Sequence, residues 1–174
     1  MRKLLLISLS VFCFIGGYAQ TKGTVSKRSV EKSSTKSKTT YSYFLLDQMK
    51  AVDDVYTAFV VDTRAFWNKE PDCDLSKLVD ERVLQITQIR STVNLSPVYI
   101  GGDDYRESVI DYIEAVSQKV KTLYGYAIID PNTQAEEYDE AMKVFDEATD
   151  VAMEKRNKLK EVKNIYEKTF YIEK

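Results

Sequence analysis

The sequence predicts an all-α protein, folded as an antiparallel up-down-up-down four-helix bundle with a long C-terminal helix. Three observations predict this fold. From residue 41 onward, apolar residues recur at spacings of three and four, which is the period of one face of a helix. The chain has only three prolines, and each separates two such segments. No segment shows the sustained alternation of apolar and polar residues that is typical of a strand.

The chain before residue 41 has a different composition. Residues 1–19 combine a basic start, an apolar run and small residues ahead of Gln20, which predicts a cleaved secretory signal peptide. The run of about 12 residues is shorter than the ~20 that span a bilayer. Residues 20–40 carry six basic side chains, one acidic side chain and no aromatic residue, so we expect a flexible basic linker. The bundle domain is then 41–174, and we expect a protein exported to the periplasm, the cell surface or the medium.

The first two helices are predicted between the linker and Pro97. We expect the first from about residue 42 to 68, stopped by Pro71, because a proline disfavours helix in the residue before it. Asp72 or Asp74 is expected to cap the second helix, since a carboxylate accepts hydrogen bonds from free backbone N–H groups. The apolar stripes of the two helices begin with Leu45, Met49 and Val52 and with Leu75, Val79 and Val83.

The third and fourth helices are predicted on either side of Asp130–Pro131. Asp104 is expected to cap the third helix. A capping box from Thr133 to Glu136, in which two side chains satisfy each other's backbone donors, predicts the start of the fourth. The fourth helix would hold about 38 residues and reach roughly 57 Å, well beyond the second helix.

The last turns of the fourth helix are apolar. In an antiparallel bundle they lie beside the start of the first helix, so we expect Tyr41, Tyr43 and Phe44 to cover them. An uncovered end would be an apolar surface and a contact for a homodimer. The apolar residues concerned are Ile165, Tyr166, Phe170, Tyr171 and Ile172.

The bundle domain is acidic. Residues 41–174 hold 17 basic and 26 acidic side chains, a net charge of −9. This charge repels phosphate groups, so we expect no nucleic acid as a partner. Within the fourth helix, residues 133–154 hold eight acids and one lysine, whereas residues 155–174 hold seven bases and three acids. That order complements the helix dipole and needs no ligand to explain it.

The residue inventory excludes several chemistries. The sequence contains no histidine, which removes histidine-based catalytic triads and histidine-ligated metal and haem sites. Cys73 is the one cysteine left after cleavage, so it can form neither an internal disulfide nor a structural zinc site. We therefore expect no catalytic residue, no cofactor and no metal. Cys73 is expected to be a small apolar filler between helices, and the alternative is a disulfide to a second chain.

The stretch SPVYIGGDDY, residues 96–105, is the least helical part of the domain. We interpret it as a connection, because the proline ends one helix, the two glycines turn the chain and the aspartates begin the next helix. The alternatives are a ligand loop at this end of the bundle and a calcium site at the aspartates. The candidate partner or ligand surface consists of Tyr99, Asp103, Asp104 and Tyr171.

Two segments carry a resemblance to a known group of proteins. GGDDYRESVIDYIEAV, which leads into the third helix, and YEKTFYIEK near the C-terminus resemble a family of uncharacterised exported bacterial surface proteins with an all-helical bundle domain. The resemblance implies an all-helical exported protein without assigned catalysis, and it transfers no site residues.

Two hypotheses for function follow from these observations. The first is a non-enzymatic cell-envelope or surface protein that binds a protein or an envelope polymer through a face of the bundle. The alternative is a protein that binds a small molecule or a glycan at one end of the bundle, with carboxylate-dependent hydrolysis as its catalytic form.

Overall fold

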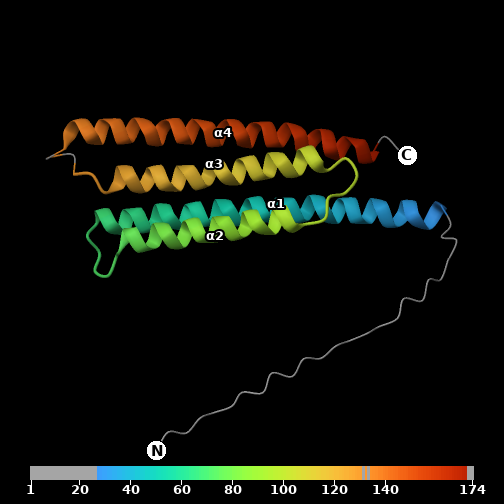
Figure 1. Cartoon of the computed structure of the whole chain (residues 1–174), viewed down its shortest axis with the longest axis horizontal. Helices are drawn as coiled ribbons and strands as arrows, with labels where there is room; N and C mark the ends of the chain where they lie inside the picture. Colours follow the sequence, from blue (N-terminus) through green and yellow to red (C-terminus); the bar gives the residue numbers. More distant parts are fainter. Residues whose placement is uncertain (1–26, 131, 133, 172–174) are drawn as a thin grey trace, which may run out of the picture.

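The computed structural model describes residues 27–130, 132 and 134–171, with side chains described between 38 and 168. It consists of four helices, and the residues described contain no strand. Figure 1 shows that the chain reverses its direction at each connection between helices. The prediction of an all-helical protein with four packed helices is confirmed. The helices are α1 (Lys27–Trp67), α2 (Leu75–Leu95), α3 (Asp103–Ala127) and α4 (Ala135–Tyr171).

The third helix, α3, is the centre of the fold. It packs against each of the other three helices, whereas α4 packs mainly against α3. Its buried residues follow one another along its whole length, from Tyr105 to Ala127. Each fully buried aliphatic side chain contributes about 1.5–3 kcal/mol. The Arg156 side chain also connects α4 to α1, 3.0 Å from Asp53 Oδ2.

The first helix begins earlier than the sequence predicts. α1 starts at Lys27, inside the 20–40 segment expected to be a flexible linker, and runs to Trp67. The expected start near residue 42 lies next to Tyr41, the first buried residue among the side chains described from residue 38 onward. Burial and helix formation are separate properties, and the periodicity of apolar residues reports only the first. The predicted signal peptide, residues 1–19, lies outside the described residues.

The helix caps agree with the sequence at α2 and differ at α3. Asp74 caps α2, and its Oδ1 accepts a hydrogen bond from the backbone N–H of Lys77 at 3.2 Å. At α3, in contrast, the cap residue is Gly102, without a side-chain cap bond, and Asp104 lies within the first turn. The expected cap at Asp104 is therefore wrong. Gly102 begins the helix because its N–H donates to the Tyr99 carbonyl at 2.8 Å, which closes a turn just before α3.

The fourth helix has nearly the expected length, with 37 residues or about 55 Å. Its end is covered in part: Tyr166 is buried, and its ring lies 6.5 Å from that of Tyr41. Tyr43 is exposed rather than part of the cover, and Ile165 is exposed as well. The predicted capping residue Thr133, the side chains of residues 169–171 and the whole of residues 172–174 lie outside what the structure describes.

Within the described part of the chain, no helix combines the length and the apolar character that a membrane span needs.

Candidate ligand-binding site

A cavity opens at the end of the bundle that holds the α1–α2 and α3–α4 connections, on the left in Figure 1. Its volume is about 860 Å³, which lies within the roughly 300–1,000 Å³ of small-molecule sites. The last turn of α1, the end of α3 and the start of α4 supply its walls. The residues that define it are Trp67, Lys69, Glu70, Tyr126, Asp130 and Tyr138.

Three aromatic rings form one wall of this cavity. The Trp67 ring meets that of Tyr126 edge-on, with ring centres 6.0 Å apart and planes at 87°. Tyr126 also packs against Tyr138, with centres 4.9 Å apart, and the two hydroxyls share a hydrogen bond. The Trp67 indole N–H donates to the carbonyl of Ala127 at 3.1 Å, so the end of α3 holds the indole in place. The rings are thus fixed by one another before any ligand arrives.

The hydrogen bond between the two tyrosine hydroxyls also changes the pKa of Tyr126. The hydrogen bond to Tyr138, together with burial, raises the pKa of Tyr126 to about 12. Tyr126 therefore stays neutral at physiological pH, and the pair of hydroxyls can donate or accept hydrogen bonds at the cavity wall.

A tight turn after α1 builds the opposite wall. Lys69 and Asp72 have φ of 55° and 66°, a left-handed conformation that few residues other than glycine adopt. The N–H of Glu70 donates to the carbonyl of Ala65 at 3.0 Å, which folds the chain back over the end of α1. The turn places one cationic and one anionic side chain, Lys69 and Glu70, at the mouth of the cavity.

Cys73 lies in the wall between this cavity and an adjoining hollow of about 670 Å³. It is a half-buried free thiol whose Sγ donates to the carbonyl of Asp62 at 3.5 Å. Burial, followed by the nearby Asp62 carboxylate, raises the pKa of the thiol. The thiol form is thereby favoured over the reactive thiolate. The position agrees with the expected role of Cys73 as a filler between helices, and its pairing with a second chain stays a prediction.

Polar groups of the α3–α4 connection complete the rim. Asp130 Oδ1 accepts hydrogen bonds from the backbone N–H and the side-chain amide of Asn132, at 2.9 and 3.0 Å. Both residues line the cavity. The rim therefore presents amide, carboxylate and ammonium groups above an aromatic wall, a combination suited to a ligand with an apolar face and several hydroxyls.

Comparisons with protein-family models, curated proteins and solved structures find no significant match to the chain. The resemblance to exported bacterial surface proteins therefore stays a prediction. The site must be interpreted from its own geometry.

The surface predicted from sequence lies at the opposite end of the molecule. Tyr99 is half-buried, and its ring packs edge-on against Tyr41 with centres 5.1 Å apart. Asp103 and Asp104 are exposed in the first turn of α3. Tyr171 is the last residue of α4, and its side chain lies outside the described residues. Tyr99 thus belongs to the packing of this end, while the two aspartates face solvent.

Aromatic rings fill that end of the bundle. Tyr41, Tyr105 and Tyr166 are all buried, and the rings of Tyr105 and Tyr166 lie 5.3 Å apart. Gly102 fits against them so closely that an added Cβ would lie 3.0 Å from the Tyr41 ring. Burial raises the pKa of Tyr105 and of Tyr166 to about 12. The connection interpretation of the 96–105 stretch agrees with this packing.

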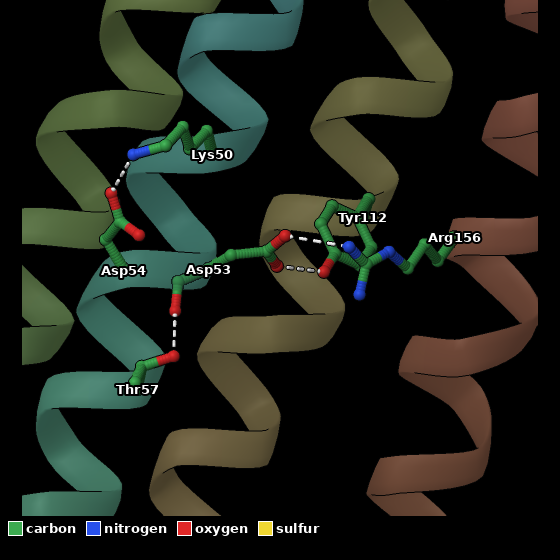
Figure 2. Close-up of polar contacts among 6 residues, drawn as sticks. All are labelled: Lys50, Asp53, Asp54, Thr57, Tyr112 and Arg156. Carbon is green, nitrogen blue, oxygen red and sulfur yellow. Dashed lines mark hydrogen bonds and ion pairs between the residues drawn. The ribbon is translucent and has the colours of Figure 1, made fainter.

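A polar cluster halfway along the bundle joins three helices (Figure 2). Asp53 of α1 accepts a hydrogen bond from the Tyr112 hydroxyl of α3 and forms an ion pair with Arg156 of α4, 3.0 Å from Oδ2. Its neighbour Asp54 points away from this cluster and pairs with Lys50 at 2.8 Å. Burial, followed by the hydrogen bond to Asp53, raises the pKa of Tyr112. Asp53 therefore anchors α4 to α1.

Sequence reasoning missed both the cavity and the Asp53 cluster. Tyr126 lies off the apolar stripe of α3, and a tyrosine in that position was the one available signal. No pattern pointed to Trp67 or to the turn at Lys69, because the left-handed backbone there is set by the fold. Among the described residues, no group of three or more histidine, cysteine, aspartate or glutamate side chains lies close enough to hold a metal ion.

Proposed function

We propose that the protein is exported and binds, without catalysis, a glycan unit of the cell envelope in the aromatic cavity around Trp67, Tyr126 and Tyr138. The observation that carries this proposal is the cavity of about 860 Å³ with three fixed rings on one wall. We also infer that the helices form an antiparallel up-down-up-down bundle, which brings the ends of α1 and α3 beside the start of α4.

The ligand class follows from the lining of the cavity. A sugar ring has an apolar C–H face that packs on a tryptophan or tyrosine ring and hydroxyls around its edge that form hydrogen bonds. Lys69, Glu70 and Asn132 can exchange hydrogen bonds with such hydroxyls at the rim. The mixed charges of the rim favour a neutral or zwitterionic ligand over a phosphate-rich one.

The absence of catalysis is part of the proposal. The sequence has no histidine, and the raised pKa values of Tyr126 and of the Cys73 thiol keep these two groups protonated at neutral pH. A group that stays protonated is a poor nucleophile or general base. Export is supported by the signal-peptide pattern of residues 1–19, and an envelope polymer is the partner that an exported protein meets there.

The test is calorimetric titration of the full chain, purified from the exported fraction of a bacterial host, with short soluble oligosaccharides of N-acetylglucosamine and of glucose. We expect saturable binding of one of them that weakens at least about tenfold in a Tyr138→Ala variant, because one stacking surface is lost. Tyr43→Ala is the matched control, since Tyr43 is an exposed tyrosine at the other end. No binding by any of these sugars, or equal loss in both variants, would contradict the proposal.

A further inference from the structure

One flank of α4 presents an unpartnered apolar stripe. Val144, Val151 and Ile165 are 42%, 48% and 64% exposed. They are separated by multiples of seven residues, so they lie on one face of the helix. Tyr138, which α4 contributes to the cavity described above, lies on another side of the helix. Apolar residues aligned on one face of a helix are a surface suited to a partner helix.

A groove continues the stripe at the start of α4. It has a volume of about 660 Å³ and lies between α3 and α4, with Val144 at one end and Gly125 in its floor. No atom lies within 4 Å of the position that a Gly125 Cβ would occupy, so the floor is open. Glu136, Glu137 and Glu140 line its edge. The groove thus has an apolar floor and an acidic rim. A segment with apolar and basic side chains would complement both.

The same helix supplies that chemistry in its second half. Residues 133–154 hold eight acids and one lysine, whereas residues 155–174 hold seven bases and three acids. Ile165 lies on the stripe in the basic half, with Lys158 one heptad before it. This half cannot fold back onto the groove of its own chain, because both belong to one continuous helix of 37 residues. A second copy can bring it there.

We propose that α4 pairs with α4 of a second copy in antiparallel orientation along the Val144–Val151–Ile165 stripe. With Val151 near the two-fold axis, Lys158 of the second copy lies opposite Val144, between Glu140 and Glu147. Ile165 of the second copy then covers the groove beside Glu137. The pairing is self-complementary, so both grooves fill at once and the assembly closes as a dimer.

The test is sedimentation equilibrium of the full chain from the exported fraction, with single substitutions on either flank of α4. We expect the wild type to form dimers whose dissociation constant rises with salt, because exposed charge pairs are screened. Val151→Glu should raise that constant at least about 100-fold by placing an unpaired charge on the axis. Met153→Glu is the matched control, since Met153 is also exposed on α4 but lies on the opposite flank, and it should leave the dimer intact.

A charge exchange tests the pairing directly. Glu147→Lys and Lys158→Glu should each weaken the dimer about fivefold, and the double variant should regain most of the loss. A wild type that stays monomeric at low salt would overturn the proposal, as would equal effects of Val151→Glu and Met153→Glu. Assemblies larger than a dimer would overturn the closed pairing. Binding of a basic peptide by a strictly monomeric wild type would assign the groove to another occupant and overturn it too.

Discussion

The two ends of the bundle are built from the same kinds of residue and differ in how they are closed. At the end with the α2–α3 connection, Tyr105 and Tyr166 are buried, and the Tyr166 ring packs against both Tyr105 and Tyr41. At the other end, Trp67 and Tyr126 pack against each other but leave a cavity of about 860 Å³ beside them. Aromatic content alone therefore does not identify a binding site. Whether aromatic rings form a cavity or a closed core depends on whether a connection between helices folds over them.

The connections between the helices have equal lengths, so their bends explain this difference. At the closed end, Gly102 has no side chain, so the chain approaches the Tyr41 ring, and the 96–105 stretch folds inward. At the open end, the left-handed residues Lys69 and Asp72 reverse the chain just after α1, and α3 ends at Ala127. Trp67 at this end stays 49% exposed.

The largest effect is expected from truncating a ring at the closed end. Tyr105→Ala should lower the free energy of unfolding by about 3–5 kcal/mol, because Tyr105 is fully buried and the neighbouring helices cannot fill the space. Tyr138→Ala, at the open end, should cost only about 1 kcal/mol. Urea unfolding followed by circular dichroism measures both. Equal losses would mean that the two ends are packed alike.

The next largest effect is expected at Asp53, which joins α1 to α4 halfway along the bundle. Asp53→Asn should lower the free energy of unfolding by about 1–2 kcal/mol, because Tyr112 and Arg156 lose a charged acceptor. Asp54→Asn is the matched control and should change it by less than about 0.5 kcal/mol, since Asp54 is exposed. The same urea unfolding experiment measures both. If Asp54→Asn destabilises the protein as much as Asp53→Asn does, the contacts of Asp53 with Tyr112 and Arg156 do not hold α4 in place.

A smaller effect is expected at alkaline pH. The pKa of Tyr105 is raised from 10.0 to about 12 by burial. The folded state therefore favours the neutral hydroxyl, and this contribution to stability is fully present below pH 10 and is lost as the pH rises through about 12. We expect Tyr105→Phe to flatten the fall of stability across this window. At pH 7 the substitution should change the free energy of unfolding by less than about 1 kcal/mol, because it removes a single hydroxyl and keeps the buried ring. An unchanged dependence of stability on pH in this variant would contradict the assignment of the alkaline loss of stability to Tyr105.

The sequence allowed the helices to be predicted and hid most of the candidate site. Apolar spacing and prolines placed α2 and α4 within a few residues, because burial of one face determines both. The start of α1 at Lys27 was missed, since the sequence there has no apolar stripe. The cavity depends on the left-handed turn at Lys69 and on Trp67 meeting Tyr126 across the fold. Contacts between distant residues leave no local pattern to detect.

Fluorescence of Trp67 tests the open end most directly, because Trp67 is the single tryptophan of the chain. We predict that titration with the oligosaccharide that binds in calorimetry shifts its emission to saturation and protects it from quenching by acrylamide. The Tyr138→Ala variant should show little of either change. An oligosaccharide that binds the wild type without altering Trp67 emission or quenching would place the site elsewhere and contradict an open aromatic end as the binding site.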